Sequence, residues 1–247
     1  MFWKSVLIFL FTGLFIRSLS AQNNFYTQSW KKVDSLLNKK GLTQSALETV
    51  TSIYNRAQKE KNNAQLIKAL IYRIGLRAST EMNATDSAIA SIESEIKRIP
   101  EPASSILRSI EAEMLWNYYS QNRWKLNDRT PTLHFNKKDI SSWDAEDFFK
   151  KISELYLSSL TNFKLVQQTR LDAYDPILIK GNSRDLRPTL FDLLGHRALD
   201  FFKNDEIDLT RPSYNFELGD ETVFADKNIF VSHRFSTQDS LSNHFKA

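Results

Sequence analysis

Residues 41–74 have the sequence GLTQSALETVTSIYNRAQKEKNNAQLIKALIYRI, and this stretch decides the fold. Its apolar residues recur every three or four positions in two runs, and the polar run KEKNN at 59–63 lies between them. Because such spacing places one apolar stripe along a helix, the pattern predicts two amphipathic helices joined as a hairpin. The two stripes are Leu47, Val50, Ile53, Tyr54 and Ala57, then Leu66, Ile67, Leu70, Ile71 and Ile74.

Signals at the start of this stretch predict where the helices begin and end. A preceding helix carries Trp30, Val33 and Leu36 on one face. It is expected to end at Gly41, because glycine adopts the left-handed conformation that closes many helices. Thr43 is expected to cap the next helix, since its hydroxyl can accept a hydrogen bond from a free backbone N–H.

Helical spacing continues beyond this hairpin. A stripe of isoleucines at 89–99 is closed by Pro100, and Pro102 is placed to open the next helix, which carries Leu107. On a helical wheel Trp116 and Tyr119 lie far from Leu107, so we expect this helix to be covered on two sides.

The stripes repeat with a weak period. Leu47 and Ile89 start corresponding stripes 42 residues apart, and Leu66 and Ile106 start the next two 40 residues apart. A period in this range is typical of helical-repeat proteins. We therefore predict an all-α fold of stacked helical hairpins, of the α-solenoid or tetratricopeptide-like kind, with each hairpin packed on the next.

The second half of the chain is more varied. The pattern predicts a long connection at 123–142, a helix at 144–162, a buried irregular strap at 167–188 and a helix at 188–203. Past residue 204, short apolar pieces at 214–216 and 228–231 indicate extended segments. We expect a helical region over 22–204 and an extended segment over 205–247 that leads into a downstream β-sandwich domain.

The first 21 residues are expected to be a signal peptide. Lys4 is followed by an apolar run at 6–16, and Ser18-Leu19-Ser20 before Ala21 offers a cleavage site. Eleven residues make about 16 Å of helix against a hydrocarbon core of about 30 Å, so an uncleaved membrane anchor is the poorer alternative. We therefore predict export to the periplasm or beyond the cell, with no membrane span after the leader is removed.

Net charge and cysteine content bear on which partners and which chemistry this chain can have. Of the 33 Lys and Arg residues, the leader removes Lys4 and Arg17, which leaves 31 against 29 Asp and Glu, a net charge of +2. Acids interrupt the basic runs, so we expect no nucleic-acid partner. The chain contains no cysteine, which excludes disulfides and a cysteine nucleophile within it.

One helix carries polar residues that resemble a catalytic or metal-binding group. Asp192, His196 and Asp200 are four residues apart. Because they span about 12 Å along a helix, at most two could ligate one metal ion. Ser183 with Asp192 and His196 could form a triad, although no nucleophile-elbow motif surrounds Ser183. We interpret this group as a hydrogen-bonded polar face docked on the strap.

Two further groups have a structural and a functional interpretation. The aromatic residues Trp116, Tyr118, Tyr119 and Trp124 could stack on a sugar or peptide, but we interpret them as interdomain packing. Three arginines and two aspartates surround the Gly181-Asn182 turn and could bind an anion, but we expect ion pairs that tie the strap to the helix at 188–203. These residues are Arg184, Arg187 and Arg197, with Asp175 and Asp185.

Four long phrases resemble one protein family. They are WKKVDSL at 30–36, GLTQSALETV with QLIKALIYRI within 41–74, WNYYSQNRWK at 116–125 and YDPILIKGNSRDLRPTLFDLLGHRALDFF at 174–202. They are similar to the N-terminal helical region of large exported alpha-2-macroglobulin family proteins of Bacteroidetes-type bacteria. The resemblance covers residues 26–204 and implies a long chain in which β-sandwich macroglobulin domains and a bait region follow. The family traps proteases, often with a reactive thioester, for which this chain has no cysteine.

The resemblance implies a non-catalytic helical region of a protease-inhibitor protein of the cell envelope. Its expected partners are the downstream macroglobulin-type domains and, through the full-length protein, proteases. We expect no enzyme activity and no catalytic, cofactor-binding or metal-binding residues. One alternative is a free-standing helical-repeat module that scaffolds an envelope protein, and another is an envelope hydrolase that uses His196.

Overall fold

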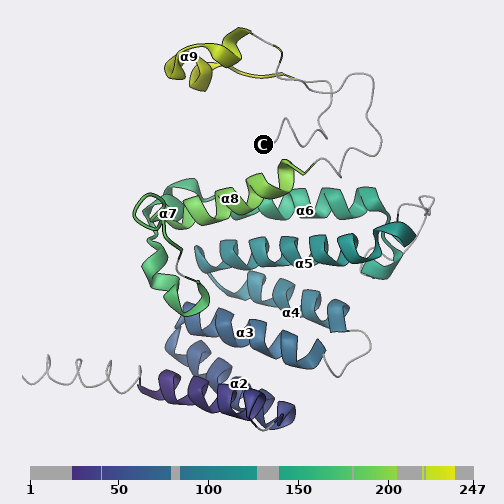
Figure 1. Cartoon of the computed structure of the whole chain (residues 1–247), viewed down its shortest axis with the longest axis vertical. Coiled ribbons are helices and arrows are strands. Elements are labelled where there is room, and N and C mark those ends of the chain that lie inside the picture. The colour runs from purple at the N-terminus through teal and green to yellow at the C-terminus, as the bar shows by residue number, and fades with distance from the viewer. Residues whose placement is uncertain are drawn as a thin grey trace, which may run out of the picture. The chain divides into compact units, whose positions relative to one another are not determined.

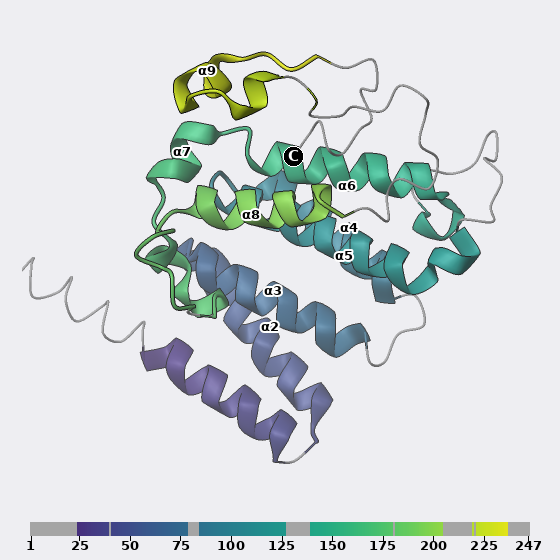
Figure 2. The ribbon, with the colours of Figure 1, turned by 45° about the horizontal axis from the view of Figure 1, so that its top comes forward.

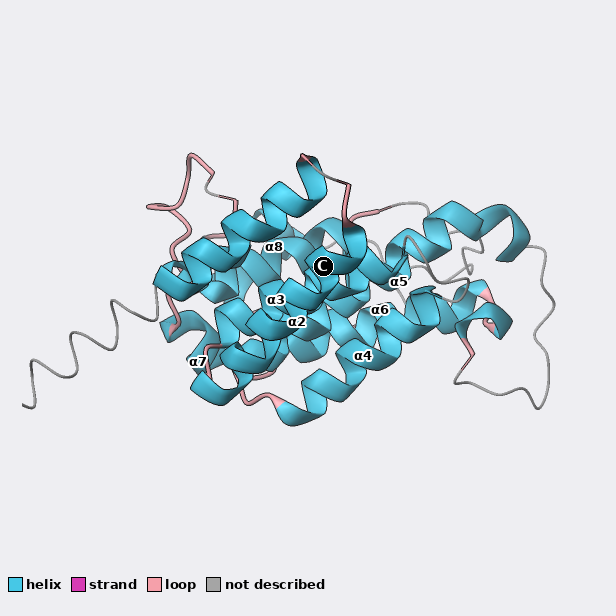
Figure 3. Cartoon of the chain, turned by 90° about the horizontal axis from the view of Figure 1, so that it is seen from below, coloured by secondary structure: helices cyan, strands magenta, loops and turns pink. Residues whose placement is uncertain are grey.

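A computed structural model describes residues 24–39, 41–78, 84–126, 139–179, 181–204, 219 and 221–236. Within these ranges the regular structure is helical and no strand is present (Figure 3), although Arg170 and Thr189 form an isolated antiparallel bridge. The predicted all-α class with helical hairpins is therefore confirmed. The chain forms two compact units, Met1–Ile99 with Asp172–Asn182 (unit 1), and Pro100–Leu171 with Ser183–Ala247 (unit 2).

Unit 1 is built on the predicted hairpin. It contains a helix over residues 24–38, followed by α2 (Thr43–Glu60), α3 (Asn63–Ala78) and α4 (Ala84–Arg98). The first of these helices packs beside α2 and α3 (Figure 2). The Tyr26 hydroxyl donates to Glu60 Oε2 of α2 over 2.6 Å, and Trp30 Nε1 donates to Gln65 Oε1 of α3 over 2.7 Å. Side-chain hydrogen bonds thus fix the first helix on the hairpin.

The turns of unit 1 follow local chemistry. Gly41 has φ +62°, and the N–H of Leu42 donates to the carbonyl of Leu36 over 2.9 Å, so Gly41 closes the first helix as predicted. The prediction that Thr43 caps α2 is wrong. Thr43 is already the first helical residue, and Leu42 occupies the cap position with no side-chain hydrogen bond. The chain enters α2 directly from the left-handed turn, so the helix begins one residue early.

Unit 2 is a second helical assembly. It contains α5 (Ala103–Leu126), the short helix η1 (Ile140–Ser142), α6 (Ala145–Ser159), α7 (Phe163–Gln168) and α8 (Leu190–Phe202). Helices α5 and α6 form a hairpin, and α8 packs on both of them (Figure 1). The repeat pattern predicted that α5 pairs with the helix before it, whereas its hairpin partner in unit 2 is α6. Buried residues on more than one side of α5 confirm that this helix is covered twice.

The predicted buried strap is largely exposed, so that expectation is wrong. Leu171 and Tyr174 are buried in η2 (Leu171–Ile177), but Ile179 is 100% exposed and Leu186 is 83% exposed. The backbone N–H groups of Leu186 and Arg187 both donate to the carbonyl of Ser183 over 3.1 Å. Because the turn satisfies its own backbone, it does not need to be covered by other elements.

The expectation of an extended segment at 228–231 is also wrong. These residues form α9 (Lys227–Ser232), which follows η4 (Glu221–Phe224). The Asp226 carboxylate accepts a 2.9 Å hydrogen bond from the N–H of Asn228 and so caps α9. This cap is a local signal that outweighs the β propensity of Ile229 and Val231. The other predicted extended piece, at 214–216, lies outside the described residues.

None of the described helices has the length and apolar character needed to cross a membrane. The predicted signal peptide at 1–21 lies outside the described residues.

We expect Thr189→Ala to lower the free energy of unfolding by about 1 kcal/mol, since it removes a side-chain cap from α8. Thr189 and Asp192 bond reciprocally at the start of α8. Thr43→Ala is the matched control at the start of α2, where the threonine makes no cap, and should change stability by less than about 0.5 kcal/mol. Urea unfolding curves of both variants measure this. Equal losses would contradict the assignment of the two caps.

Candidate functional site

Asp192 of α8 forms hydrogen bonds with the residue that caps the same helix. Asp192 Oδ2 accepts from the backbone N–H of Thr189 over 2.9 Å and from its hydroxyl over 2.7 Å. The N–H of Asp192 donates to the Thr189 hydroxyl over 3.3 Å, which completes a capping box. A carboxylate at the first turn also interacts favourably with the helix dipole. Asp192 therefore stabilises the start of α8.

His196 is likewise engaged with its own helix. Its Nδ1 lies 2.7 Å from the backbone carbonyl oxygen of Asp192, so Nδ1 carries the proton and donates. Ser183 lies in an exposed turn, and no hydrogen bond joins it to His196 or Asp192 among the described residues. The structure does not assemble the triad considered from the sequence. Within the described part of the chain, no group of three or more His, Cys, Asp or Glu side chains is placed to hold a metal ion.

The aromatic residues of α5 form a packed cluster within unit 2. The Trp116 ring stacks on Tyr119 with centroids 5.6 Å apart and meets Phe201 of α8 edge-on at 5.4 Å. Tyr118 stacks on Phe148 of α6 at 5.7 Å. The cluster therefore joins helices of one unit, which corrects the expectation of interdomain packing.

Trp124 does not belong to this cluster. It is 66% exposed, and the Lys125 ammonium lies 4.7 Å from its ring centroid. The structure thus separates the four aromatic residues of this group into three that pack against other rings and one that is exposed on the surface.

Arg197 joins α8 to α5. Its Nε donates to the Ser109 hydroxyl over 2.8 Å, and one Nη donates to the Ser109 carbonyl over 3.1 Å and to Glu113 Oε2 over 2.7 Å. The expectation that Arg197 pairs with the strap is wrong, because all three acceptors lie on α5. Of the other two arginines in that group, Arg187 is exposed and Arg184 is half-buried.

A buried carboxylate links α2 and α4 and was missed in the sequence. Glu95 is only 7% exposed, and its carboxylate accepts from the Tyr54 hydroxyl of α2 and from the Arg98 guanidinium of α4. Burial is the largest cause that raises the pKa of Tyr54, followed by the hydrogen bond to Glu95. Only the Glu95-Arg98 spacing was visible in the sequence, because Tyr54 lies 41 residues away from Glu95.

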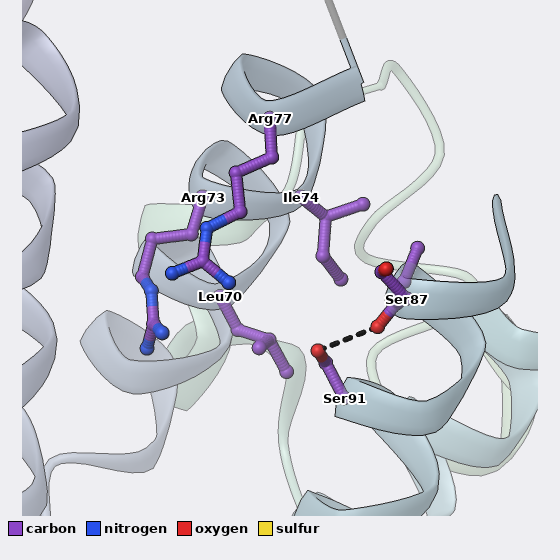
Figure 4. A pocket seen from close by; sticks show the side chains of 7 residues that line it. Leu70, Arg73, Ile74, Arg77, Ser87 and Ser91 are labelled. Atoms are coloured by element: carbon purple, nitrogen blue, oxygen red, sulfur yellow. Dashed lines mark hydrogen bonds between the residues drawn. The ribbon is translucent and has the colours of Figure 1, made fainter. Parts of the chain in front are cut away.

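A small pocket lies between α3 and α4 (Figure 4). It encloses about 20 Å³, which is far below the several hundred Å³ of a cofactor site. Its floor is apolar, and it carries two arginines from α3 and two serines from α4. The lining residues are Leu70, Arg73, Ile74, Arg77, Ser87, Ala88 and Ser91. The four-residue spacing of Arg73 and Arg77 was the sequence signal that could have revealed it.

The comparisons with known proteins return no match. Neither the family models nor the curated proteins nor the solved structures give a match to this chain.

We expect stability to fall as the pH rises above about 10, because buried tyrosines resist ionisation. Burial raises the pKa of Tyr156 from 10.0 to about 12 and also raises that of Tyr26. The unfolded chain then ionises first, so the stabilising contribution is full below pH 10 and is lost as the pH rises through the folded-state pKa. Thermal melts from pH 8 to 11 measure the loss.

Tyr156→Phe provides the control for this alkaline effect. The variant cannot ionise at this position, so its melting temperature should fall less steeply above pH 10 than that of the parent protein. Parallel curves would contradict the assignment of Tyr156 as one of the groups responsible.

Proposed function

We propose that this chain is a non-catalytic N-terminal helical region of a macroglobulin-like protease-inhibitor protein of the cell envelope. The observation that carries the proposal is the position, in the structure, of the sequence phrases that resemble the macroglobulin family. Their characteristic residues build contacts between helices, which is what a supporting region needs. The fold alone does not imply this function, because helical hairpins serve many functions.

The phrase at 30–36 supports this role through the core of unit 1. Trp30, Val33 and Leu36 are buried, and the Trp30 ring packs on Tyr72 of α3 with centroids 4.8 Å apart. The Lys68 ammonium lies 4.5 Å from the centroid of the Trp30 ring. This phrase therefore supplies packing and a cation–π contact.

The phrase at 116–125 and the later part of the last phrase, at 183–202, support the same role in unit 2. Trp116 from the first phrase meets Phe201 from the second, and Tyr156 of α6 also packs on Phe201 at 5.3 Å. Arg197 from the second phrase holds α5 through Ser109 and Glu113. Of the polar side chains that suggested chemistry, Arg197 joins two helices, whereas Asp192 and His196 form hydrogen bonds within α8.

The reading frame beyond codon 247 tests the proposal. We expect a continuous frame that encodes β-rich domains, and the resulting long protein should inhibit proteases. The 247-residue protein on its own should not inhibit them, because the bait and trapping parts would lie downstream. A stop codon after Ala247, or protease inhibition by the 247-residue protein alone, would overturn the assignment.

A free-standing binding module is the second candidate, and one observation favours it. In η4 and α9, Phe224 and Val231 are highly exposed and Ile229 is more than half exposed. The two short helices contact each other, and contiguous exposed apolar patches are typical of interaction sites. A stop codon at residue 247, together with loss of partner capture in Val231→Asp, would favour this candidate.

Export is a separate part of the proposal, and it rests on residues 1–21. We expect protein from cell-envelope fractions to begin at about Ala21 or Gln22. N-terminal sequencing measures this, and a cytosolic protein that retains Met1 would contradict it.

A further inference from the structure

The pocket between α3 and α4 is lined by a cation, Arg73, whose Nε has no acceptor in the described part of the chain. Arg73 is half-buried, its Nε is inaccessible to solvent, and it makes no hydrogen bond or ion pair with any described residue. Its guanidinium packs over Tyr54, whose ring centroid lies 4.4 Å from the guanidinium carbon. A cation–π contact compensates only part of the cost of desolvating a guanidinium.

A second cation lies on the same wall of the pocket. Arg77 is one helical turn beyond Arg73, and both side chains line the pocket. Like charges four residues apart on a helix repel each other. Arg77 has an interaction partner of its own, whereas the Nε of Arg73 has no hydrogen-bond acceptor among the described residues. A bound anion would relieve the repulsion and satisfy Arg73.

The rest of the pocket suits a short hydrocarbon stem and one polar group. In Figure 4 both guanidinium groups lie on one side of Leu70 and Ile74, and the two serines lie on the other. The Ser91 hydroxyl donates to the carbonyl of Ser87 over 2.7 Å, whereas the Ser87 hydroxyl makes no hydrogen bond with the described residues. Charged, apolar and polar surfaces therefore follow one another across the pocket.

The apolar wall of the pocket distinguishes between oxyanions. The planar fork of a guanidinium pairs with a carboxylate and with a phosphate alike. A carboxylate on a hydrocarbon stem also offers an apolar part that can pack on Leu70 and Ile74, which line the pocket, whereas inorganic phosphate has none. The pocket therefore favours the carboxylate.

We propose that the α3–α4 pocket binds a carboxylate on a short aliphatic stem, with Arg73 as the principal donor. The stem packs on Leu70 and Ile74, and the Ser87 hydroxyl lies across the pocket for a further polar group. A small free acid and an acidic side chain of a peptide both present this chemistry. This inference does not depend on the proposed function.

NMR titration of the purified protein tests the proposal through the Nε–H signals of arginine. The probes are sodium butyrate, the peptide acetyl-Gly-Glu-Gly-amide and inorganic phosphate, all at constant ionic strength. Arg73→Lys assigns the Arg73 signal by removing it. We expect a saturable shift of this signal with butyrate or with the peptide, and whichever probe binds more tightly identifies the source of the carboxylate.

Variants distinguish a specific site from general charge attraction. Arg73→Gln should weaken binding by about tenfold or more, since it removes charged hydrogen bonds. Arg187→Gln removes an exposed arginine of unit 2 and should leave binding unchanged. If Arg73→Gln does not fold, Arg73→Lys replaces it and should also bind more weakly, because lysine lacks the guanidinium fork.

Three results would overturn the proposal. They are the absence of a saturable shift with butyrate and with the peptide, phosphate binding as tight as that of the carboxylates, and equal weakening by Arg187→Gln and the Arg73 variant.

Discussion

Phe148→Ala should lower the free energy of unfolding by about 3–5 kcal/mol, the range for truncation of a buried aromatic side chain. Phe148 is fully buried on α6. Its ring packs on Tyr118 of α5 with centroids 5.7 Å apart and on Trp143 at 5.1 Å. The alanine variant leaves a cavity and also loses these aromatic pairs. Urea unfolding followed by circular dichroism measures the change.

Phe163→Ala is the matched control for Phe148→Ala. Phe163 lies on α7 in the same unit, is half exposed and has an edge-on contact with Phe191. We expect Phe163→Ala to lower the free energy of unfolding by less than about 1.5 kcal/mol, the upper value for an aromatic pair. A loss at Phe163 as large as that at Phe148 would contradict the packing described for unit 2.

Leu107→Ala should lower the free energy of unfolding by about 2–5 kcal/mol. Leu107 is fully buried on α5, whose buried residues lie on more than one side of the helix. Because neighbours on both sides restrict collapse around the site, the cavity is expected to persist, which places the loss toward the upper part of this range.

Leu157→Ala on α6 is the control for Leu107→Ala, because both variants replace a helical leucine with alanine and so change helix propensity equally. Leu157 is 44% exposed, so its truncation should cost less than about 1 kcal/mol. A loss below about 0.5 kcal/mol at Leu107 would mean that its face of α5 is open to solvent, and that result would favour a binding groove.

Local sequence patterns were sufficient to predict the helices of unit 1. The stripes that begin at Leu47 and Leu66 correspond to α2 and α3, and Gly41 closes the first helix through its positive φ. Helix formation depends on residues three or four positions apart, so it can be recognised without the fold. Short segments were predicted less well, because in α9 one cap outweighs the preference of the apolar residues for strands.

The candidate sites were predicted less well than the helices. The capping box of Thr189 and Asp192 is a local motif, and its three-residue spacing was available in the sequence. In contrast, Arg197 reaches Ser109, a residue 88 positions away in the chain. No local spacing indicates such a partner, and the arginine was therefore assigned to its neighbours on the strap.

The sequence by itself determined the all-α class, the hairpin of α2 and α3 and most helix ends, because these follow from contacts within a few residues. Only the tertiary structure decided that α5 pairs with α6, that Trp116 packs while Trp124 is exposed, and that the Nε of Arg73 has no acceptor among the residues the structure describes. Those outcomes depend on which helix faces meet, and residues far apart in the chain set the burial and the partners of each side chain.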